Sequence, residues 1–173
     1  QAEMASKLGI STSYLNLIER NQRPATVQFL LRLGQAFDID LVQLPLNIFD
    51  RRLIDNGMLK LLSQKGIEIH ARSIFLQGLM LMQNSSRPRK FDRWDSLWYL
   101  WSEWLNDYKI SPLEASVRYA MSFSEVSKAL VGIDSVNQLM EIMSAASGVL
   151  PPIPNELYTD DPLLLNPSNW NQI

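Results

Sequence analysis

Short apolar segments with strand character alternate with segments of helical spacing across residues 39–150, and this alternation constrains the fold more than any other feature. Strand patterns cover residues 41–44, 67–71 and 129–131, and helical patterns cover residues 53–65, 94–105, 112–121 and 135–146. Strands that alternate with helices predict βαβ units and a parallel sheet. We therefore expect an α/β fold, in which three strands are too few to close a barrel.

Local signals refine these elements. Ser111 with Glu114, and Ser135 with Gln138, form the pattern of a capping box, and Gly66 is expected to end the helix at 53–65. The tryptophans between residues 94 and 104 fall at helical spacing, so we interpret them as a packing stripe rather than a ligand-stacking surface. The basic run at 87–90 and the acidic pair at 160–161 are expected to be solvated, and residues 151–173 form a Pro- and Asn-rich tail.

The first 38 residues have a different character, because they predict three short helices without a strand. Gly9 is expected to end the first helix, Ser11 to cap the second and Thr26 to cap the third. Up to residue 37 the segment is mildly basic, with cations at Lys7, Arg20, Arg23 and Arg32 against anions at Glu3 and Glu19.

Composition excludes several classes of function. The chain has no cysteine, which excludes disulfides, thiolate metal sites and thiol nucleophiles. No apolar run approaches the roughly 18 residues of a membrane span, and no signal peptide is recognisable, so we expect a cytoplasmic protein without a membrane partner. The net charge of −2 gives no overall attraction to nucleic acid. Because Gln1 already lies within a helical pattern, we expect the natural chain to continue upstream.

The sequence QAEMASKLGIS at residues 1–11 is followed by YLNLIERNQRP at residues 14–24. With a small residue at Ala5, a turn glycine at Gly9 and an inward Ile10, this segment resembles the Xre (Cro/C1-type) helix-turn-helix family. The resemblance implies that the helix at 11–20 lies in the major groove of DNA. It implies base contacts by Ser11, Thr12, Ser13 and Asn16, and phosphate contacts by Gln1, Arg20 and Arg23.

A second set of motifs follows in the order VQLPLN at 42–47, GIEIHARS at 66–73, LQGLM at 76–80, SPLEA at 111–115 and VGIDS at 131–135. Residues 39–150 thereby resemble the C-terminal part of the aldo/keto reductases. The resemblance implies the last three strands of a (β/α)8 TIM barrel, hence a partial barrel. The expected division is 1–38 helix-turn-helix segment, 39–150 barrel part and 151–173 tail.

The same resemblance implies part of a site for a nicotinamide dinucleotide, NAD(P). Gln43 would meet the carboxamide, and the loop with Ser73, Leu76 and Gly78 would hold the pyrophosphate. The phosphate and adenosine would be surrounded by Gly132, Ser135, Gln138 and Glu141, where a loop runs into a helix N-terminus that favours anions.

Two positions depart from the family pattern. Arg72 stands where many members have an aromatic that stacks on nicotinamide. Asp134 stands where many have an arginine for the 2′-phosphate, so NAD fits at least as well as NADP.

Catalysis is not predicted from these residues. The family's Asp, Tyr, Lys and His tetrad belongs to the first half of the barrel, which this sequence does not contain. His70 is interpreted as a structural strand histidine, and no metal site is expected. Three functions remain open: an aldo/keto reductase fragment with part of a cofactor site, a DNA-binding regulator, and a fusion or assembly product without a function of its own. We also expect self-association through open sheet edges.

Overall fold

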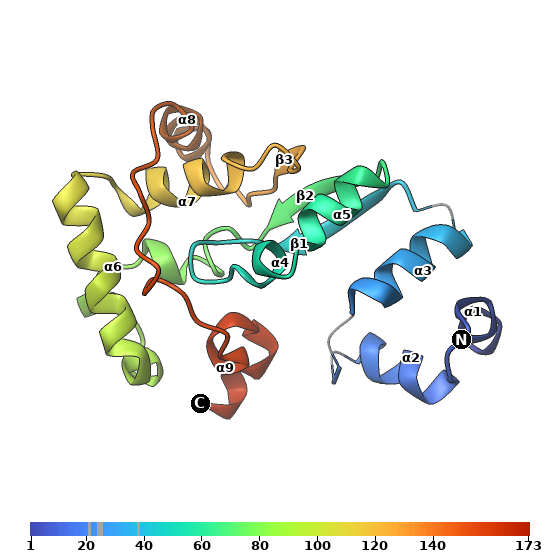
Figure 1. Ribbon diagram of the computed structural model, residues 1–173. Helices are drawn as coiled ribbons and strands as arrows, with labels where there is room; N and C mark the ends of the chain where they lie inside the picture. Colours follow the sequence, from blue (N-terminus) through green and yellow to red (C-terminus); the bar gives the residue numbers. More distant parts are fainter. Residues whose placement is uncertain (21, 24–25, 38) are drawn as a thin grey trace.

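The computed structural model describes residues 1–20, 22–23, 26–37 and 39–173 (Figure 1). Residues 21 and 24 of the motif at 14–24, and residue 38 at the end of the expected helix-turn-helix segment, lie outside the described residues. The elements follow the order α1 Ala2–Leu8, α2 Thr12–Glu19, α3 Val27–Phe37, β1 Leu41–Pro45, α4 Arg52–Asp55, α5 Met58–Gln64, β2 Glu68–Arg72, η1 Leu79–Leu81, η2 Asn84–Ser86, η3 Arg89–Trp94, α6 Asp95–Tyr108, α7 Pro112–Met121, β3 Lys128–Ala129, α8 Val136–Ala145, α9 Pro162–Leu165 and η4 Pro167–Gln172.

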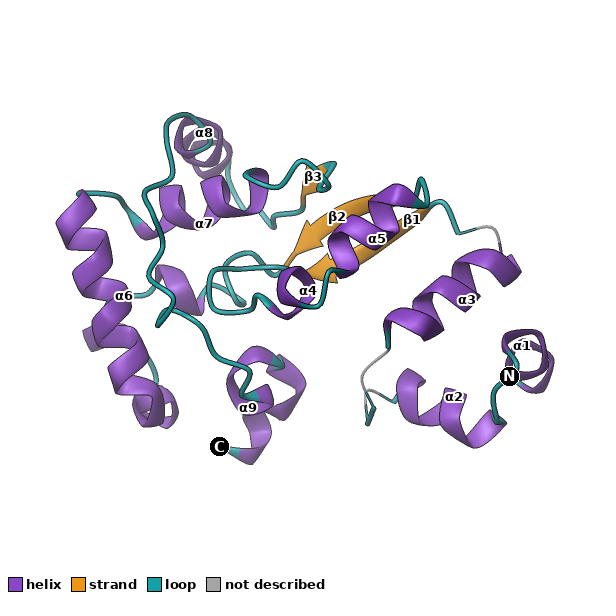
Figure 2. Ribbon diagram, viewed as in Figure 1, coloured by secondary structure: helices purple, strands orange, loops and turns teal. Residues whose placement is uncertain are grey.

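The strands form one parallel sheet in the order β1-β2-β3, which confirms the α/β prediction (Figure 2). The register of β1 and β2 runs from Leu41 opposite Glu68 to Pro45 opposite Arg72. β3 is shorter than the predicted strand at 129–131, because only Lys128 and Ala129 pair with β2. Among the described residues the sheet is a three-stranded part of a barrel rather than a closed one.

The two faces of the sheet differ in polarity. Leu44, Ile69 and Ala71 are buried in the main core, on the side where α5 and α7 pack. Gln43 and His70 occupy one register row with Lys128, and side chains alternate between faces along a strand. The second face therefore carries polar and charged side chains.

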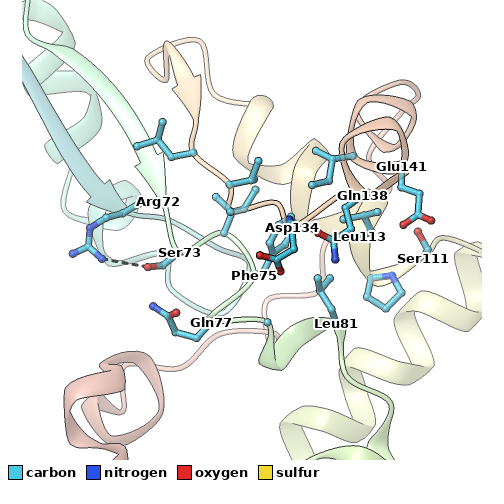
Figure 3. Close-up of a pocket in the computed structure, with 17 residues that line it drawn as sticks. Arg72, Ser73, Phe75, Gln77, Leu81, Ser111, Leu113, Asp134, Gln138 and Glu141 are labelled. Atoms are coloured by element: carbon cyan, nitrogen blue, oxygen red, sulfur yellow. Dashed lines mark hydrogen bonds between the residues drawn. The ribbon is translucent and has the colours of Figure 1, made fainter. Parts of the chain in front are cut away.

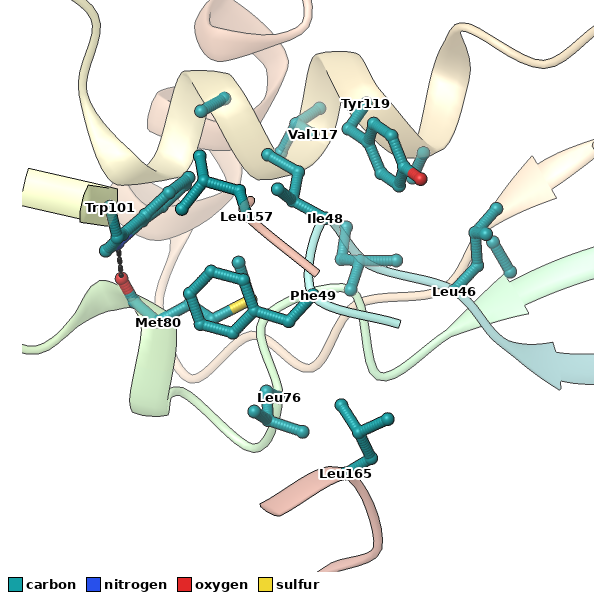
Figure 4. Packing of buried hydrophobic residues seen from close by; sticks show 14 of the residues in the cluster. Leu46, Ile48, Phe49, Leu76, Met80, Trp101, Val117, Tyr119, Leu157 and Leu165 are labelled. Carbon is teal, nitrogen blue, oxygen red and sulfur yellow. Dashed lines mark hydrogen bonds between the residues drawn. The ribbon is translucent and has the colours of Figure 1, made fainter. Parts of the chain in front are cut away.

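Aromatic side chains from α6 belong to the main core, where Trp101 lies beside Met80 (Figure 4). The rings of Trp98 and Trp101 lie 5.1 and 5.5 Å from the ring of Phe49. Trp98, Trp101 and Trp104 are buried, and their indole N–H groups donate to carbonyls of Phe91, Met80 and Pro152. The predicted packing stripe is thus confirmed.

Two local predictions are wrong. The helix expected at 53–65 is broken into α4 and α5, because Gly57 adopts a left-handed φ of 72°. At the start of α8, Ser135 Oγ accepts from the N–H of Gln138 as expected. The Gln138 side chain, however, accepts from the N–H of Asp134 at 2.7 Å, so the reciprocal bond of a capping box is displaced by one residue.

Some residues that were expected to be solvated make contacts within the protein. Arg87 stacks over the ring of Trp98 at 3.8 Å. Asp161 caps α9 and accepts from the indole of Trp94 at 3.1 Å. The tail at 151–173 packs on the body of the protein, because Leu157 and Leu164 are buried.

The helices α1–α3 form a small core of their own, with Ala5, Leu8, Leu15 and Phe29 buried. The predicted caps are confirmed: Gly9 is left-handed, Ser11 Oγ accepts from Tyr14 N, and Thr26 Oγ1 accepts from Phe29 N. Among the described residues, every helix is too short or too polar to cross a membrane.

Candidate functional site

A cavity of about 890 Å³ lies where β2 and β3 end (Figure 3). Its wall comes from the loop after β2 between residues 72 and 81, the start of α7 at 111–113, the loop at 130–134 and the first turns of α8. The carboxyl ends of parallel strands are the usual place for ligand sites in α/β folds. The fold therefore places this cavity where a ligand is expected.

The loop after β2 has an unusual backbone. Ser73, Leu76 and Gln77 have φ of 56°, 46° and 56°, and Gly78 follows with 82°. Left-handed non-glycine residues cost about 1–3 kcal/mol each and are retained where the surroundings enforce them. Burial of Leu76 and the hydrogen bond of 3.2 Å from Asn47 Nδ2 to the carbonyl of Ser73 are two such restraints.

This loop presents hydrogen-bond donors at the cavity. Gln77 and Gly78 both line the cavity. No described residue accepts a hydrogen bond from the backbone N–H group of either one. Successive backbone N–H groups in such turns form concavities that bind anions. The loop is thus suited chemically to a phosphate group.

The start of α8 lies next to the cavity, although residues 135–137 of its first turn are not among those that line it. Its first N–H groups have no intrahelical partner, and the helix dipole makes this end electropositive. Gly132 precedes it without a positive φ, and a Cβ added there would meet nothing within 4 Å. Gly132 therefore leaves open space on the cavity wall although its conformation does not require glycine.

Charges divide the cavity into two ends (Figure 3). Arg72 lies at one end with Ser73, to which its Nη1 donates at 3.2 Å. Asp134 and Glu141 lie toward the other end, on the loop before α8 and on α8 itself. Among the described lining residues, Arg72 supplies the single cationic side chain.

The structure brings most of the predicted cofactor residues together. Leu76 is buried and supports the loop, Ser135 caps α8 beside the cavity, and Gln43 lies on β1 outside the lining. The predicted residues that do line it are Ser73, Gly78, Gly132, Asp134, Gln138 and Glu141. Sequence reasoning missed Gln77, Leu81 and Leu113, because no local pattern tells which side of a loop or helix start meets a distant segment.

His70 lies on the polar face of the sheet, and its Nε2 is 2.8 Å from Glu68 Oε1. Lys128 Nζ is 3.4 Å from the same oxygen. The hydrogen bond with His70, followed by that with Lys128, lowers the pKa of Glu68. His70 does not line the cavity, in agreement with a structural role. Over the described parts of the chain, no group of three or more His, Asp or Glu side chains could hold a metal ion.

The residues predicted to contact DNA gather on and around α2. Thr12 and Ser13 are exposed and Asn16 is half-buried, while Ser11 is engaged as the cap. The three residues predicted to contact phosphates differ in their contacts. Gln1 donates to the carboxylate of Glu19, and Arg20 is exposed. The guanidinium of Arg23 lies 5.4 Å from the ring of Tyr14.

Comparison with known proteins agrees with the α/β architecture. The model of the aldo/keto reductase family matches residues 6–153. The match thus includes α2 and α3, which the sequence analysis assigned to a separate segment, as well as the sheet and the cavity. No curated protein and no solved structure matches the chain significantly. The chain belongs to the aldo/keto reductase family.

Proposed function

We propose that the cavity binds a nicotinamide dinucleotide, with the pyrophosphate between the loop at 76–78 and the start of α8. One observation carries this proposal: a left-handed loop with the N–H groups of Gln77 and Gly78 lines the cavity, and the start of α8, a helix N-terminus, lies next to it. Its volume of about 890 Å³ falls within the range of small-molecule and cofactor sites.

The remaining residues fit the rest of such a ligand. Phe75, Leu81 and Leu113 supply apolar surface along the wall, and Gly132 leaves room for close approach. Gln43 would bond the carboxamide from β1. The dinucleotide, when bound, would deliver hydride to a carbonyl carbon or accept it from the carbon of the corresponding alcohol, and these residues would hold and orient it.

We infer further that this chain alone does not catalyse that transfer. Among the described residues that line the cavity there is no Tyr, Lys or His to donate a proton to a carbonyl oxygen. Incubation with NADH or NADPH and a panel of aldehydes should give no steady oxidation of the dinucleotide. Enzyme-dependent oxidation that scales with protein concentration would contradict this.

Binding is tested by titrating the chain with NADH and with NADPH. Calorimetry and the fluorescence emission of the reduced nicotinamide measure the dissociation constants. Gly132→Ala should weaken binding of the preferred dinucleotide by about tenfold, since the added methyl occupies space that the ligand needs. Ser147→Ala, an exposed change beyond the C-terminal end of α8, is the control and should leave the affinity unchanged. Absence of binding by either dinucleotide would favour a chain without a function of its own.

A second candidate function is sequence-specific DNA binding by α2. It is favoured by the turn at Gly9, the cap at Ser11 and the separate small core of α1–α3. A salt-dependent gel shift that is lost in the double variant Ser13→Ala, Asn16→Ala would support it. Asn106→Ala on α6 is the control. A shift that survives the double variant would assign DNA binding to other residues.

A further inference from the structure

The outer face of α8 carries large apolar side chains that contact solvent. Val136, Leu139, Met140 and Met143 are between 39% and 75% exposed, and we call them the α8 stripe. Positions i, i+3, i+4 and i+7 share one face of a helix. On the opposite side, Ala145 is buried where α8 packs on α7, at the upper edge of the molecule in Figure 1. A contiguous apolar patch on the surface of a soluble protein marks a site where another molecule binds.

We infer that the α8 stripe binds the α8 stripe of a second copy of this chain, with the two helices antiparallel. The order of the residues supports a twofold pair. The midpoint of the stripe falls between Leu139 and Met140, and Val136 and Met143 lie equally far from it. Rotation by half a turn about this midpoint places Val136 opposite Met143 of the other copy, and Met143 opposite its Val136. Such self-complementary contacts are what a twofold interface requires.

Charges favour the same arrangement. The charged side chain within α8, that of Glu141, lines the cavity and not the stripe, so two chains of net charge −2 can meet there without like charges in contact. In the antiparallel register, Asp134 falls opposite residue 145 of the other copy. Arg118, which also bonds Glu114, donates to the carbonyl of Ala145 at 3.0 Å. Each copy therefore brings an exposed carboxylate toward a guanidinium of the other, and the two helix dipoles are antiparallel.

The size of the stripe determines how tightly two copies bind. α8 has 10 residues and is therefore about 15 Å long. Ile133 and Val149, which are 44% and 85% exposed, extend the apolar surface beyond its two ends. A stable interface buries about 800 Å² on each partner, and one pair of helices of this length buries less. We therefore expect a reversible dimer with a dissociation constant on the order of 10–100 μM.

The first test measures the dissociation constant of the dimer by sedimentation velocity. Every chain carries Leu41→Lys, which charges the open edge of β1 and so opposes pairing at that edge. Met140→Glu at the centre of the stripe brings two carboxylates together across the twofold axis, and it should raise the dissociation constant at least about tenfold. Tyr99→Glu on α6 adds the same charge at 61% exposure, against 64% for Met140, and should leave the constant unchanged. Circular dichroism of each variant confirms that it is folded.

The second test uses cysteines to determine the orientation, since the chain has none of its own. A chain with Val136→Cys and an affinity-tagged chain with Met143→Cys are mixed and oxidised mildly. The mixed disulfide dimer should exceed both dimers of like chains, because the antiparallel register places residue 136 opposite residue 143. Disulfides that form mainly between like chains would mean that the helices are parallel, and they would overturn the inference.

Two further results would also overturn it. One is a chain with an intact stripe that stays monomeric up to several times the expected dissociation constant, so that a different partner or none covers the stripe. The other is an equal dissociation constant with and without Met140→Glu, which would place the contact between copies elsewhere. Each of these results leaves dinucleotide binding untouched, because the four residues of the stripe do not line the cavity.

Discussion

Among the glycines of the chain, Gly148 is the one where an added Cβ would meet the shortest contact. Its φ is +112°, and an added Cβ would lie 2.8 Å from Cζ of Arg118. Arg118 ties the end of α8 to α7 through the carbonyls of Ala145 and Val149. Gly148→Ala should therefore lower the free energy of unfolding by about 2–3 kcal/mol, measured by urea denaturation.

The matched comparison for this prediction is Gly132→Ala. Gly132 has no positive φ, and its new methyl would collide with nothing, so the unfolding free energy should be unchanged or rise by at most about 1 kcal/mol. Equal stability of the two variants would contradict the role given to Arg118.

The capping box of α7 makes stability depend on pH. Hydrogen bonds from the N–H and hydroxyl of Ser111, ahead of the contribution of Arg118, lower the pKa of Glu114. A depressed pKa in the folded state stabilises the protein above the ordinary glutamate pKa of about 4.3. That contribution is lost as the pH falls from there through the folded pKa.

Glu114→Gln tests this linkage. The glutamine keeps a hydrogen-bonding side chain but cannot ionise, so the native chain should be the more stable of the two at pH 7. The difference in unfolding free energy should close on acidification below about pH 4. A difference that stays constant over this range would mean that ionisation of Glu114 does not contribute to the free energy of unfolding.

Caps were predictable from single residues, whereas the conformation of the loop at 73–78 was not. Ser11, Ser111 and Gly9 act on backbone groups within three or four positions, so sequence spacing is sufficient to recognise them. The left-handed turns at Leu76 and Gln77 depend on burial and on distant residues, as in the bond from Asn47 to Ser73. Local propensity alone would disfavour them.

At the scale of elements, α6 contributes three buried tryptophans to the core. Trp101 is buried, stacks on Trp104 at 5.5 Å and donates to the carbonyl of Met80 at 3.3 Å. Trp101→Ala should cost about 3–5 kcal/mol of unfolding free energy, because it leaves a large cavity and an unpaired carbonyl. Tyr99→Ala, at a position of the same helix with 61% exposure, should cost less than about 0.5 kcal/mol by the same denaturation measurement. Similar losses for both would indicate that helix propensity, not packing, governs α6.

Element type was easier to predict than element length. The apolar run at 129–131 correctly indicates a strand beside β2, but the strand is Lys128–Ala129, so only Ala129 of the predicted run belongs to it. The length of a strand depends on the partner that it meets, and after Ala129 the chain soon leaves β2 to line the cavity at Leu130 and Val131. Gly57 similarly divides one helical pattern into two helices, since only the surrounding packing decides whether a glycine is accommodated within a helix.

At the scale of the molecule, the sheet is protected on its faces and open at its edges. Helices cover the apolar face, and the row of Gln43, His70 and Lys128 makes the other face polar. β1 and β3 each pair with β2 on one side, and among the described residues no strand pairs with their outer edges. The expected tendency to associate is therefore located at the edges rather than on an exposed apolar sheet.

We predict that the chain self-associates through the edge at β1. Leu41, the first residue of β1, is 38% exposed, and Leu41→Lys should weaken association because a charge at an edge strand opposes pairing with another strand. Leu17→Lys makes the same change at 37% exposure on α2 and should leave association unaltered. Sedimentation velocity over a wide range of protein concentration measures the size of the species for each chain. A native chain that remains monomeric throughout and unfolds cooperatively would contradict the prediction. Equal weakening by both substitutions would show that general surface hydrophobicity, rather than the strand edge, drives association.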